Sequence, residues 1–286
     1  MLNAITIDVE EWFHVSRFRK HIDPADWDSL ESRVIPSVAR VLQVLKEHNV
    51  RATFFVLAWV AEQHPNIVKM IEEHGHDIGT HGYAHQLVYD LGPKEFAKDL
   101  EKSLKILRGI ANTEIESYRA PSFSINKDSL WAFKILKDHD IHIDSSFFPV
   151  KHDLYGGVES PRDFFYVPVN GSGHVLECPL ATRQVADRAF PIAGGGYLRM
   201  FPLWFLESSI KVINKLGRPA VIYFHPWEID QFQPRVAAKM MDRFLHYNNI
   251  DQTEQKLHSL LKKFSFSTLR EVIDETKVEH TWPEWD

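Results

Sequence analysis

The sequence predicts an α/β protein in which helices cover a parallel sheet. Short apolar segments alternate with amphipathic helical segments, and polar residues follow the ends of the apolar segments. Hydrophobic residues make up 44% of the 286-residue chain, which is enough for a sizeable core. Because α/β barrels of this length are often single domains, we expect one domain spanning residues 1–286.

The first half of the chain carries the alternation most clearly. Residues 4–9 read as a buried strand, and the apolar residues of the segment from Val34 to His48 fall on one helical stripe. Further strands are expected at 51–57, 77–80, 117–120 and 141–144, and further helices at 59–73, 93–107 and 126–137, the last with Asn126 as its N-cap. This βαβα order predicts a parallel sheet.

The second half begins with residues 147–200, which are rich in Gly and Pro and interrupt the alternation. We expect a loop-rich insertion with short antiparallel strands at 165–169 and 174–178, either on the surface or as a wall of the substrate site. A helix at 203–216 and a strand at 220–225 restore the pattern, and residues 234–286 form a helical C-terminal extension. The tail at 280–285 is expected to be either a partner contact or a disordered end.

Charge and cysteine content exclude some classes of function. The formal net charge of −6 argues against a large basic surface, so nucleic acid is not expected as a partner. Cys178 is the single cysteine, which excludes an intrachain disulfide and fits a reducing compartment. The N-terminus lacks the basic region of a signal peptide, and no apolar run reaches the length of a membrane span. We therefore expect a cytoplasmic protein, and a homo-oligomer is possible.

Two histidines, His81 and His85, follow the short strand expected at 77–80. On one turn of helix this spacing would place both imidazoles on the same face, where both could reach one metal ion. The spacing by itself is weak evidence, because 16 histidines give about one such pair by chance. The rest of the chain must therefore decide between a metal site and coincidence.

Polar side chains follow the ends of five expected strands. Asp8 and Glu10 lie on the same face of the first strand, where they repel each other unless a cation or a proton lies between them. The full set is Asp8, Glu10, His81, His85, Arg119, Asp144 and His225. Each one alone could be a solvated turn, an ion pair or a structural histidine. Because the carboxyl ends of parallel strands converge on one face, the whole set predicts one site.

These motifs resemble those of the polysaccharide deacetylases of carbohydrate esterase family 4, the NodB-homology enzymes, in the family's order over about residues 3–230. The matching segments are 6–10, 81–85, 119–123, 144–146 and the strand that ends at His225. Longer strings at 152–156, 194–199 and 224–228 resemble the branch associated with exopolysaccharide and exosortase loci. The resemblance implies a distorted (β/α)7 barrel with an irregular insertion, and a divalent metal, most often zinc.

The resemblance also implies a metal site made of His81, His85 and a carboxylate. Most of the family has two adjacent aspartates in the first motif, one a base and one a ligand, but Val9 occupies the second position here. We therefore assign Glu10 as the ligand and Asp8 as the base that takes a proton from water. The exchange of these two roles stays open.

Three further roles follow from the resemblance. Arg119 would keep the base ionised, and a backbone N–H after Pro121, that of Ser122, would help to hold the oxyanion. His225, paired with Asp144, would protonate the leaving amine. The protein would then be a metal-dependent hydrolase of amide bonds that removes acetyl groups from the N-acetylhexosamine units of a polysaccharide or its precursor.

Carbohydrate contacts are expected from aromatic and neighbouring polar residues, because aromatic faces stack on sugar rings. The candidates are Trp12, Ser122, Phe123, Tyr155, Tyr197, Arg199 and Trp227. The alternatives are a same-fold amidohydrolase acting on a small cyclic amide or imide, a non-catalytic sugar-binding module and a structural metal protein.

Overall fold

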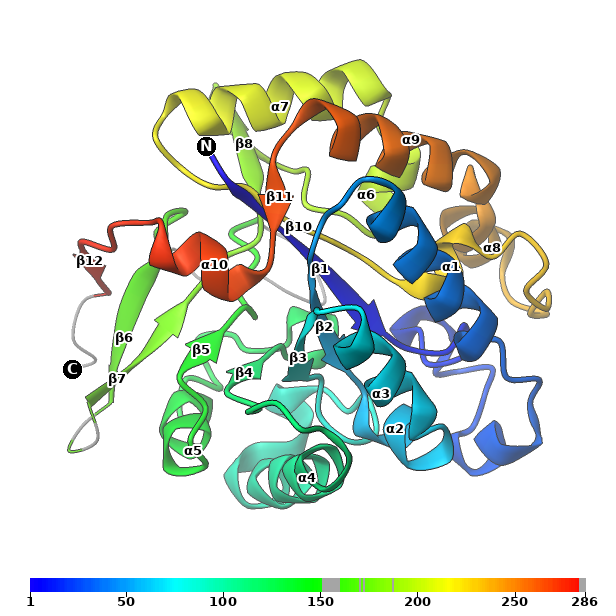
Figure 1. The fold of residues 1–286 in the computed structure, drawn as a ribbon. Coiled ribbons are helices and arrows are strands. Elements are labelled where there is room, and N and C mark those ends of the chain that lie inside the picture. The colour runs from blue at the N-terminus through cyan, green and yellow to red at the C-terminus, as the bar shows by residue number, and fades with distance from the viewer. Residues whose placement is uncertain (151–159, 170, 172, 187, 283–286) are drawn as a thin grey trace.

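Parallel strands lie at the centre of the computed structural model, which describes residues 1–150, 160–169, 171, 173–186 and 188–282 (Figure 1). The strands are β1 (Asn3–Val9), β2 (Thr53–Val56), β3 (Asp77–Thr80), β4 (Ser117–Tyr118), β5 (Ile143–Asp144), β6 (Phe165–Val169), β7 (Gly173–Glu177), β8 (Thr182–Val185), β9 (Arg188–Pro191), β10 (Val221–Phe224), β11 (Phe266–Ser267) and β12 (His280–Thr281). The main sheet has the order β10-β1-β2-β3-β4-β5-β7-β6-β12, with β11 also paired to β1. Neighbours from β10 to β7 are parallel, which confirms the expected α/β class.

Helices surround these strands on the outside (Figure 1). The α-helices are α1 (Val34–Glu47), α2 (Ala58–Gln63), α3 (Asn66–Glu73), α4 (Val88–Ile110), α5 (Ala132–Asp138), α6 (Gly196–Met200), α7 (Leu203–Lys215), α8 (Met240–Tyr247), α9 (Ile250–Lys263) and α10 (Leu269–Asp274), and the 3-10 helices are η1 (Ser16–Phe18), η2 (Pro24–Ser29), η3 (Pro121–Phe123) and η4 (Pro226–Ile229). In α1 the predicted stripe, from Val34 to Leu45, is buried against the core.

The sheet closes on itself where the chain leaves β7. The Ala181 N–H donates to the Val221 carbonyl at 3.1 Å, and the Tyr223 N–H donates to the Ala193 carbonyl at 2.7 Å. Gly194 bridges Tyr223 directly, and a Cβ at this glycine would lie 1.5 Å from the Tyr223 carbonyl oxygen. Only glycine allows this approach, so the Gly-rich string serves closure of the distorted seven-stranded barrel.

Three predicted helices differ from the structure. The helix expected from Asn126 begins at Ala132, because the Asn126 side chain accepts from the Asp128 N–H at 2.9 Å and closes a separate turn. The helix at 59–73 is divided into α2 and α3 at His64 and Pro65, and α4 begins earlier than expected, with a kink at Gly92 (φ 69°).

The segment 147–200 is only in part an insertion. Its strands β6 and β7 are antiparallel as expected, but β7 also pairs in parallel with β5 and so belongs to the barrel. The tail adds β12 to the edge of β6, and the Trp282 ring lies 5.3 Å from that of Phe147 and 5.8 Å from that of Phe165. Residues 283–286 lie outside the described part of the chain.

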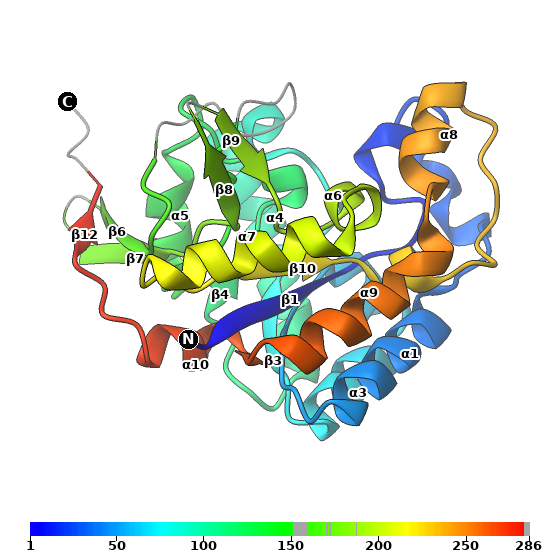
Figure 2. The ribbon, with the colours of Figure 1, turned by 90° about the horizontal axis from the view of Figure 1, so that it is seen from above.

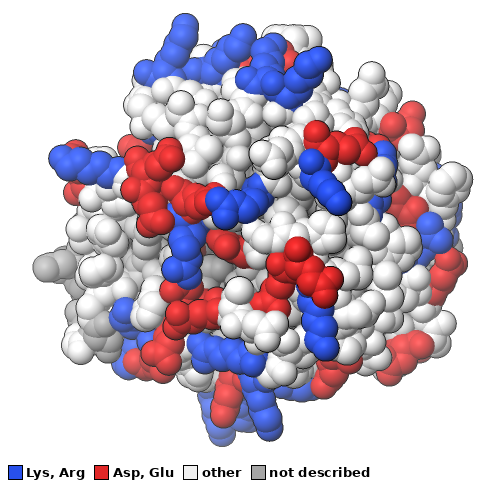
Figure 3. All heavy atoms as spheres, viewed as in Figure 1, with Lys and Arg blue, Asp and Glu red and all other residues white. Residues whose placement is uncertain are grey.

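Positive and negative side chains are interspersed on the face seen in Figure 3. A second view places α8, the β8–β9 hairpin and the loops after β1 on one side of the barrel (Figure 2). Within the described residues, no helix combines the length and the apolar character needed to cross a membrane.

His76 provides a test of core electrostatics. Its Nδ1 accepts the Ala52 N–H at 3.2 Å, and burial, with His74 and Arg51 nearby, lowers the pKa of His76 from 6.5 to about 4. Between pH 6.5 and 4 the His76 side chain is protonated in the unfolded chain but neutral in the folded protein. The free energy of unfolding is therefore highest above pH 6.5 and decreases as the pH falls toward 4. We expect the free energy of unfolding to be about 2 kcal/mol lower at pH 5 than at pH 7.5 because of this one group, as measured by urea unfolding at both pH values.

The His76→Gln variant should lose this part of the pH dependence, whereas His74→Gln, at an exposed neighbouring position, should keep most of it, because burial is the largest cause of the lowered pKa of His76. Equal pH dependence in wild type and His76→Gln would contradict the assignment.

Candidate active site

Asp8 lies at the carboxyl end of β1, and its carboxylate is almost fully buried. Arg119 Nη1 donates to Asp8 Oδ1 at 2.7 Å, and the same nitrogen donates to Thr6 Oγ1 at 2.7 Å. Arg119 Nε also donates to the Ser145 carbonyl at 3.0 Å, so the fully buried guanidinium is fixed from three sides. The pair neutralises two buried charges and holds the carboxylate in one orientation.

Glu10 lies beside this pair and contacts both histidines of the predicted metal site. Its Oε1 is 3.2 Å from His81 Nε2 and 3.2 Å from His85 Nε2, and all three side chains are buried. His81 Nδ1 lies 2.8 Å from the Arg119 carbonyl oxygen. A carbonyl can only accept, so Nδ1 carries the proton and Nε2 is left with a lone pair that faces Glu10.

The geometry of this cluster fits a tetrahedral metal. Zinc bonds to histidine nitrogen and carboxylate oxygen are about 2.0–2.1 Å long, which places adjacent ligand atoms about 3.3 Å apart. The observed separations of 3.2 Å match this value, and the three ligand atoms all lie within 4.8 Å of one another. Burial would raise the pKa of Glu10, but the imidazoles of His85, His225 and His81 outweigh it, so the pKa is well below its ordinary value.

The histidine pair is not helical, contrary to the sequence prediction. Gly82 and His85 both have positive φ, at 73° and 52°. The loop carbonyls of Gly82 and Tyr83 accept from the Ala58 and Trp59 N–H groups at the start of α2 instead of from a helical turn. Both imidazoles still reach Glu10, because the loop rather than a helix face turns them toward it.

His225, at the end of β10, has a different partner from the one expected. The prediction paired it with Asp144, but His225 Nδ1 lies 2.7 Å from Glu228 Oε1, and Arg199 Nε donates to the other Glu228 oxygen at 2.7 Å. Burial would lower the pKa of His225, but the carboxylates of Glu10, Glu228 and Asp8 outweigh it and raise the pKa to about 9. Burial opposes ionisation of Glu228, yet Arg199 and His225 lower its pKa to about 2.

Asp144 instead supports the backbone under Arg119. Its carboxylate accepts the hydroxyl of Ser146 at 2.7 Å, and the Ser146 oxygen accepts the Ala120 N–H at 2.8 Å. Glu177 lies against Asp144, and burial, together with this neighbouring charge, raises the pKa of Glu177 well above its usual value. Asp144 thus acts on the site through the loop and has no contact with the imidazole of His225 among the described bonds.

These groups line a cavity of about 480 Å³ at the carboxyl ends of the strands. Asp8, Glu10, His81, His85 and His225 all border it. Of the predicted sugar contacts, Ser122, Phe123, Tyr197, Arg199 and Trp227 also border it. Tyr155 lies outside the described residues.

The cavity wall after β4 has an unusual backbone. Ser122 and Phe123 have positive φ, at 51° and 54°, a conformation that non-glycine residues rarely adopt. Strained residues of this kind cluster at active sites, where they set the direction of a backbone group. The Ser122 hydroxyl lies 2.6 Å from that of Ser16, which joins this turn to the loop after β1.

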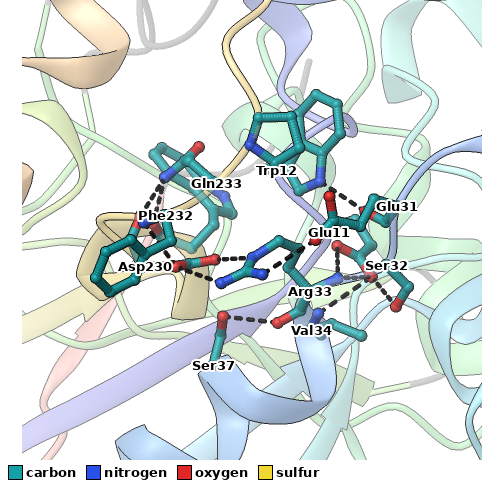
Figure 4. A network of polar contacts seen from close by, with 12 residues as sticks. Glu11, Trp12, Glu31, Ser32, Arg33, Val34, Ser37, Asp230, Phe232 and Gln233 are labelled. Atoms are coloured by element: carbon teal, nitrogen blue, oxygen red, sulfur yellow. Dashed lines mark hydrogen bonds and ion pairs between the residues drawn. The ribbon is translucent and has the colours of Figure 1, made fainter.

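Trp12 lies in a separate aromatic cluster with Phe13, Trp27 and Trp227. Its indole N–H donates to the Glu31 carbonyl at 2.9 Å (Figure 4). Trp12 was predicted to contact the sugar, but its side chain packs in this cluster and does not border the cavity.

A polar network fixes the chain just after Glu10 (Figure 4). The Glu11 carboxylate accepts from the N–H groups of Arg33 and Val34 at 3.0–3.1 Å, at the start of α1. Arg33 donates through two nitrogens to Asp230 at 2.6 and 3.0 Å, which ties α1 to the loop after β10. A carboxylate at a helix N-terminus is stabilising, and here it also anchors the metal-site strand.

Sequence reasoning missed Glu228, although its spacing of three residues from His225 gave a signal. It also missed the basic residues that border the cavity, Arg17, Lys20 and Lys239. These come from the loop after β1 and from the start of α8, and no motif connects them.

The fold and the site together define an α/β barrel protein with a buried Glu–His–His cluster, suited to a metal ion, at the carboxyl ends of its strands. Residues 33–142 match the family described as polysaccharide deacetylase, and residues 145–274 match a domain of unknown function, DUF3473. Residues 33–142 are thus similar to polysaccharide deacetylases.

Two curated relatives illustrate the match. The chain is 39% identical over 94 residues to a peptidoglycan-N-acetylglucosamine deacetylase of Bacillus cereus, covering 32% of this chain and 34% of that protein. It is 32% identical over 88 residues to a chitooligosaccharide deacetylase of Azorhizobium caulinodans, covering 30% and 42%. The chain thus spans less than half the length of these relatives.

A solved structure shares the fold over nearly the whole chain. It is a candidate polysaccharide deacetylase from Mycobacterium smegmatis, with a TM-score of 0.63 and 19% identity, covering 99% of this chain and 94% of that one. At this identity the likeness extends to the fold alone.

Metal analysis of variants tests the cluster. After loading with zinc and gel filtration, His81→Ala and Glu10→Gln should lose most bound metal, since each removes one of three protein ligands. Asp8→Asn should keep it, and so should His21→Ala, at a histidine that borders the same cavity outside the cluster. Loss of metal in Asp8→Asn with retention in Glu10→Gln would exchange the two roles.

Proposed function

We propose that this protein is a metal-dependent N-deacetylase that removes acetyl groups from N-acetylhexosamine units of a polysaccharide or its precursor. One observation carries the proposal: the Glu10–His81–His85 cluster borders the same cavity as Asp8, which is paired with Arg119, and His225, which is paired with Glu228. Amide hydrolysis needs a base, an electrophile and an acid for the amine, and this arrangement supplies all three. The names of the two relatives support the same reaction.

Glu10, His81 and His85 would hold the divalent metal, for which we propose zinc. When bound, zinc supplies Lewis acidity toward the amide carbonyl and lowers the pKa of water. Structural zinc is usually four-coordinate with cysteine, and the single cysteine, Cys178, is buried elsewhere, so three ligands with room for substrate favour a catalytic site.

Asp8 is the proposed base that takes a proton from the attacking water. Its orientation is set by Arg119 Nη1, which donates to Asp8 Oδ1 at 2.7 Å. The turn at Ser122 also borders the cavity, and we assign the Ser122 N–H to the developing oxyanion.

His225 is the proposed acid that protonates the leaving amine. An amide nitrogen cannot leave as an anion, so a proton must reach it as the C–N bond breaks. Glu228 holds Nδ1 at 2.7 Å, which directs Nε2 toward the cavity, and His225 Nε2 is 3.5 Å from Glu10 Oε1. The imidazole thus lies next to the metal cluster, where the nitrogen of the substrate would be released.

The sugar would contact Phe123, Tyr197 and Trp227, whose rings border the cavity. Arg199 borders it too, but its guanidinium is committed to Glu228. The alternative is an amidohydrolase of the same fold that acts on small cyclic amides. Such a substrate requires a closed pocket, whereas a polymer requires an open groove.

The decisive assay is acetate release from N-acetylglucosamine oligomers of increasing length, run beside small cyclic amides. We expect zinc-loaded protein to release acetate at a rate that rises with chain length, and Asp8→Asn to reduce turnover by roughly 10²–10⁴-fold while it keeps its metal. Because Asp8→Asn also breaks the buried ion pair with Arg119, circular dichroism should show that the variant still folds. Turnover of cyclic amides alone would refute the polysaccharide proposal.

Glu228→Gln tests the imidazole partner. The amide cannot stabilise a protonated imidazole as a carboxylate does, so kcat should fall by roughly 10–100-fold with KM and metal content little changed. Glu228→Asp should recover part of the loss. Full activity in Glu228→Gln would remove this pair from the reaction.

A further inference from the structure

Helix α8 exposes an apolar face that the fold does not cover. Met240 is 86% exposed, Met241 65% and Phe244 55%. Phe232, on the loop before the helix, is 82% exposed. Nine large hydrophobic side chains are exposed among the described residues, and these four lie within one short segment. A cluster of this kind marks an interaction site more often than a neutral surface.

Exposed basic residues accompany these apolar side chains. Arg235, Lys239 and Arg243 are exposed, whereas the whole chain has a net charge of −6. Asp242, the carboxylate within α8, is paired with Arg17 of the adjacent loop at 3.4 Å. We define the α8 surface as Arg235, Lys239, Met240, Met241, Arg243 and Phe244. Apolar side chains flanked by lysine and arginine are typical of helices that lie in the interface of an anionic membrane.

The α8 surface adjoins the cavity. Lys239, Asp242 and Leu245 of this segment border the cavity together with Asp8 and His225. The loop that carries Arg17 packs against the same helix, since the Phe18 ring lies 4.7 Å from that of His246. Figure 2 shows α8 on the same side of the barrel as this loop. A surface bound through α8 would therefore lie next to the entrance used by substrate.

We propose that the α8 surface docks on the headgroup region of an anionic lipid bilayer. The apolar side chains enter the membrane interface. The positively charged side chains of Arg235, Lys239 and Arg243 contact the negatively charged lipid phosphates. Docking brings the cavity to saccharides attached to lipid carriers. The inference concerns where the protein binds and holds whether or not the deacetylase reaction is correct.

Vesicle co-sedimentation of the full chain tests the proposal without any substrate. Wild-type protein should bind vesicles of phosphatidylglycerol and phosphatidylcholine, bind vesicles of phosphatidylcholine alone much more weakly, and be released as NaCl rises from about 0.1 to 0.5 M, because salt screens the charge contacts. The Met240→Ser/Met241→Ser/Phe244→Ser variant should partition at least about tenfold more weakly. Arg243→Glu should also weaken binding to the anionic vesicles.

Matched controls come from α7, whose C-terminal end lies across the molecule from α8 in Figures 1 and 2. Leu216→Ser removes a side chain that is 64% exposed there, and Lys211→Glu makes the same kind of charge change as Arg243→Glu. Both controls should bind as wild type does, and unchanged thermal unfolding should show that all variants fold. Absence of wild-type binding to anionic vesicles, or equal binding by the α8 and α7 variants, would overturn the proposal.

Discussion

Two ionised carboxylates in the protein interior, Asp8 and Glu10, are the constraint on which the rest of the site depends. Each buried charge costs several kcal/mol unless a partner of opposite charge lies beside it. Asp8 meets this cost through Arg119 at 2.7 Å, and Glu10 lies 3.2 Å from two imidazole nitrogens, in a position suited to a metal ion that would supply the positive charge. Without the partners, β1 could not end in two acids within the barrel.

The same solution recurs around the cavity. Glu228 is paired with Arg199, and Asp230 with Arg33, each at 2.6–2.7 Å. In both pairs the arginine comes from another element, so each pair ties two parts of the chain together. Asp144 has no arginine partner of this kind within the described part of the chain. It lies against Glu177, whose raised pKa favours the protonated, neutral form, so the two buried carboxyl groups need not both be charged. The polar interior is thus a set of locally neutral groups, and each fixes one wall of the site.

Different elements of the fold supply the different groups that line the cavity. The end of β1 and the loop after β3 supply the metal cluster, β4 supplies the arginine and the strained turn, and β10 supplies the imidazole. The remaining wall, formed by the loop after β1 and by α8, carries basic and apolar residues that take no part in the proposed reaction. Chemistry and positioning are therefore built on different elements, which allows the outer wall to meet a surface while the strand ends stay rigid.

The sequence by itself determined the alternation of strands and helices in the first half of the chain, the parallel sheet and the residues at the strand ends. These follow from periodicities of 2 and 3.6 and from motif order, which are local properties. Only the tertiary structure decided which side chains meet. His225 is held by Glu228 and not by Asp144, Trp12 packs behind the site, and the His81–His85 pair converges through a loop instead of a helix. Partner choice depends on how distant segments pack and on which backbone groups are already bonded, and neither is a property of a short stretch of sequence.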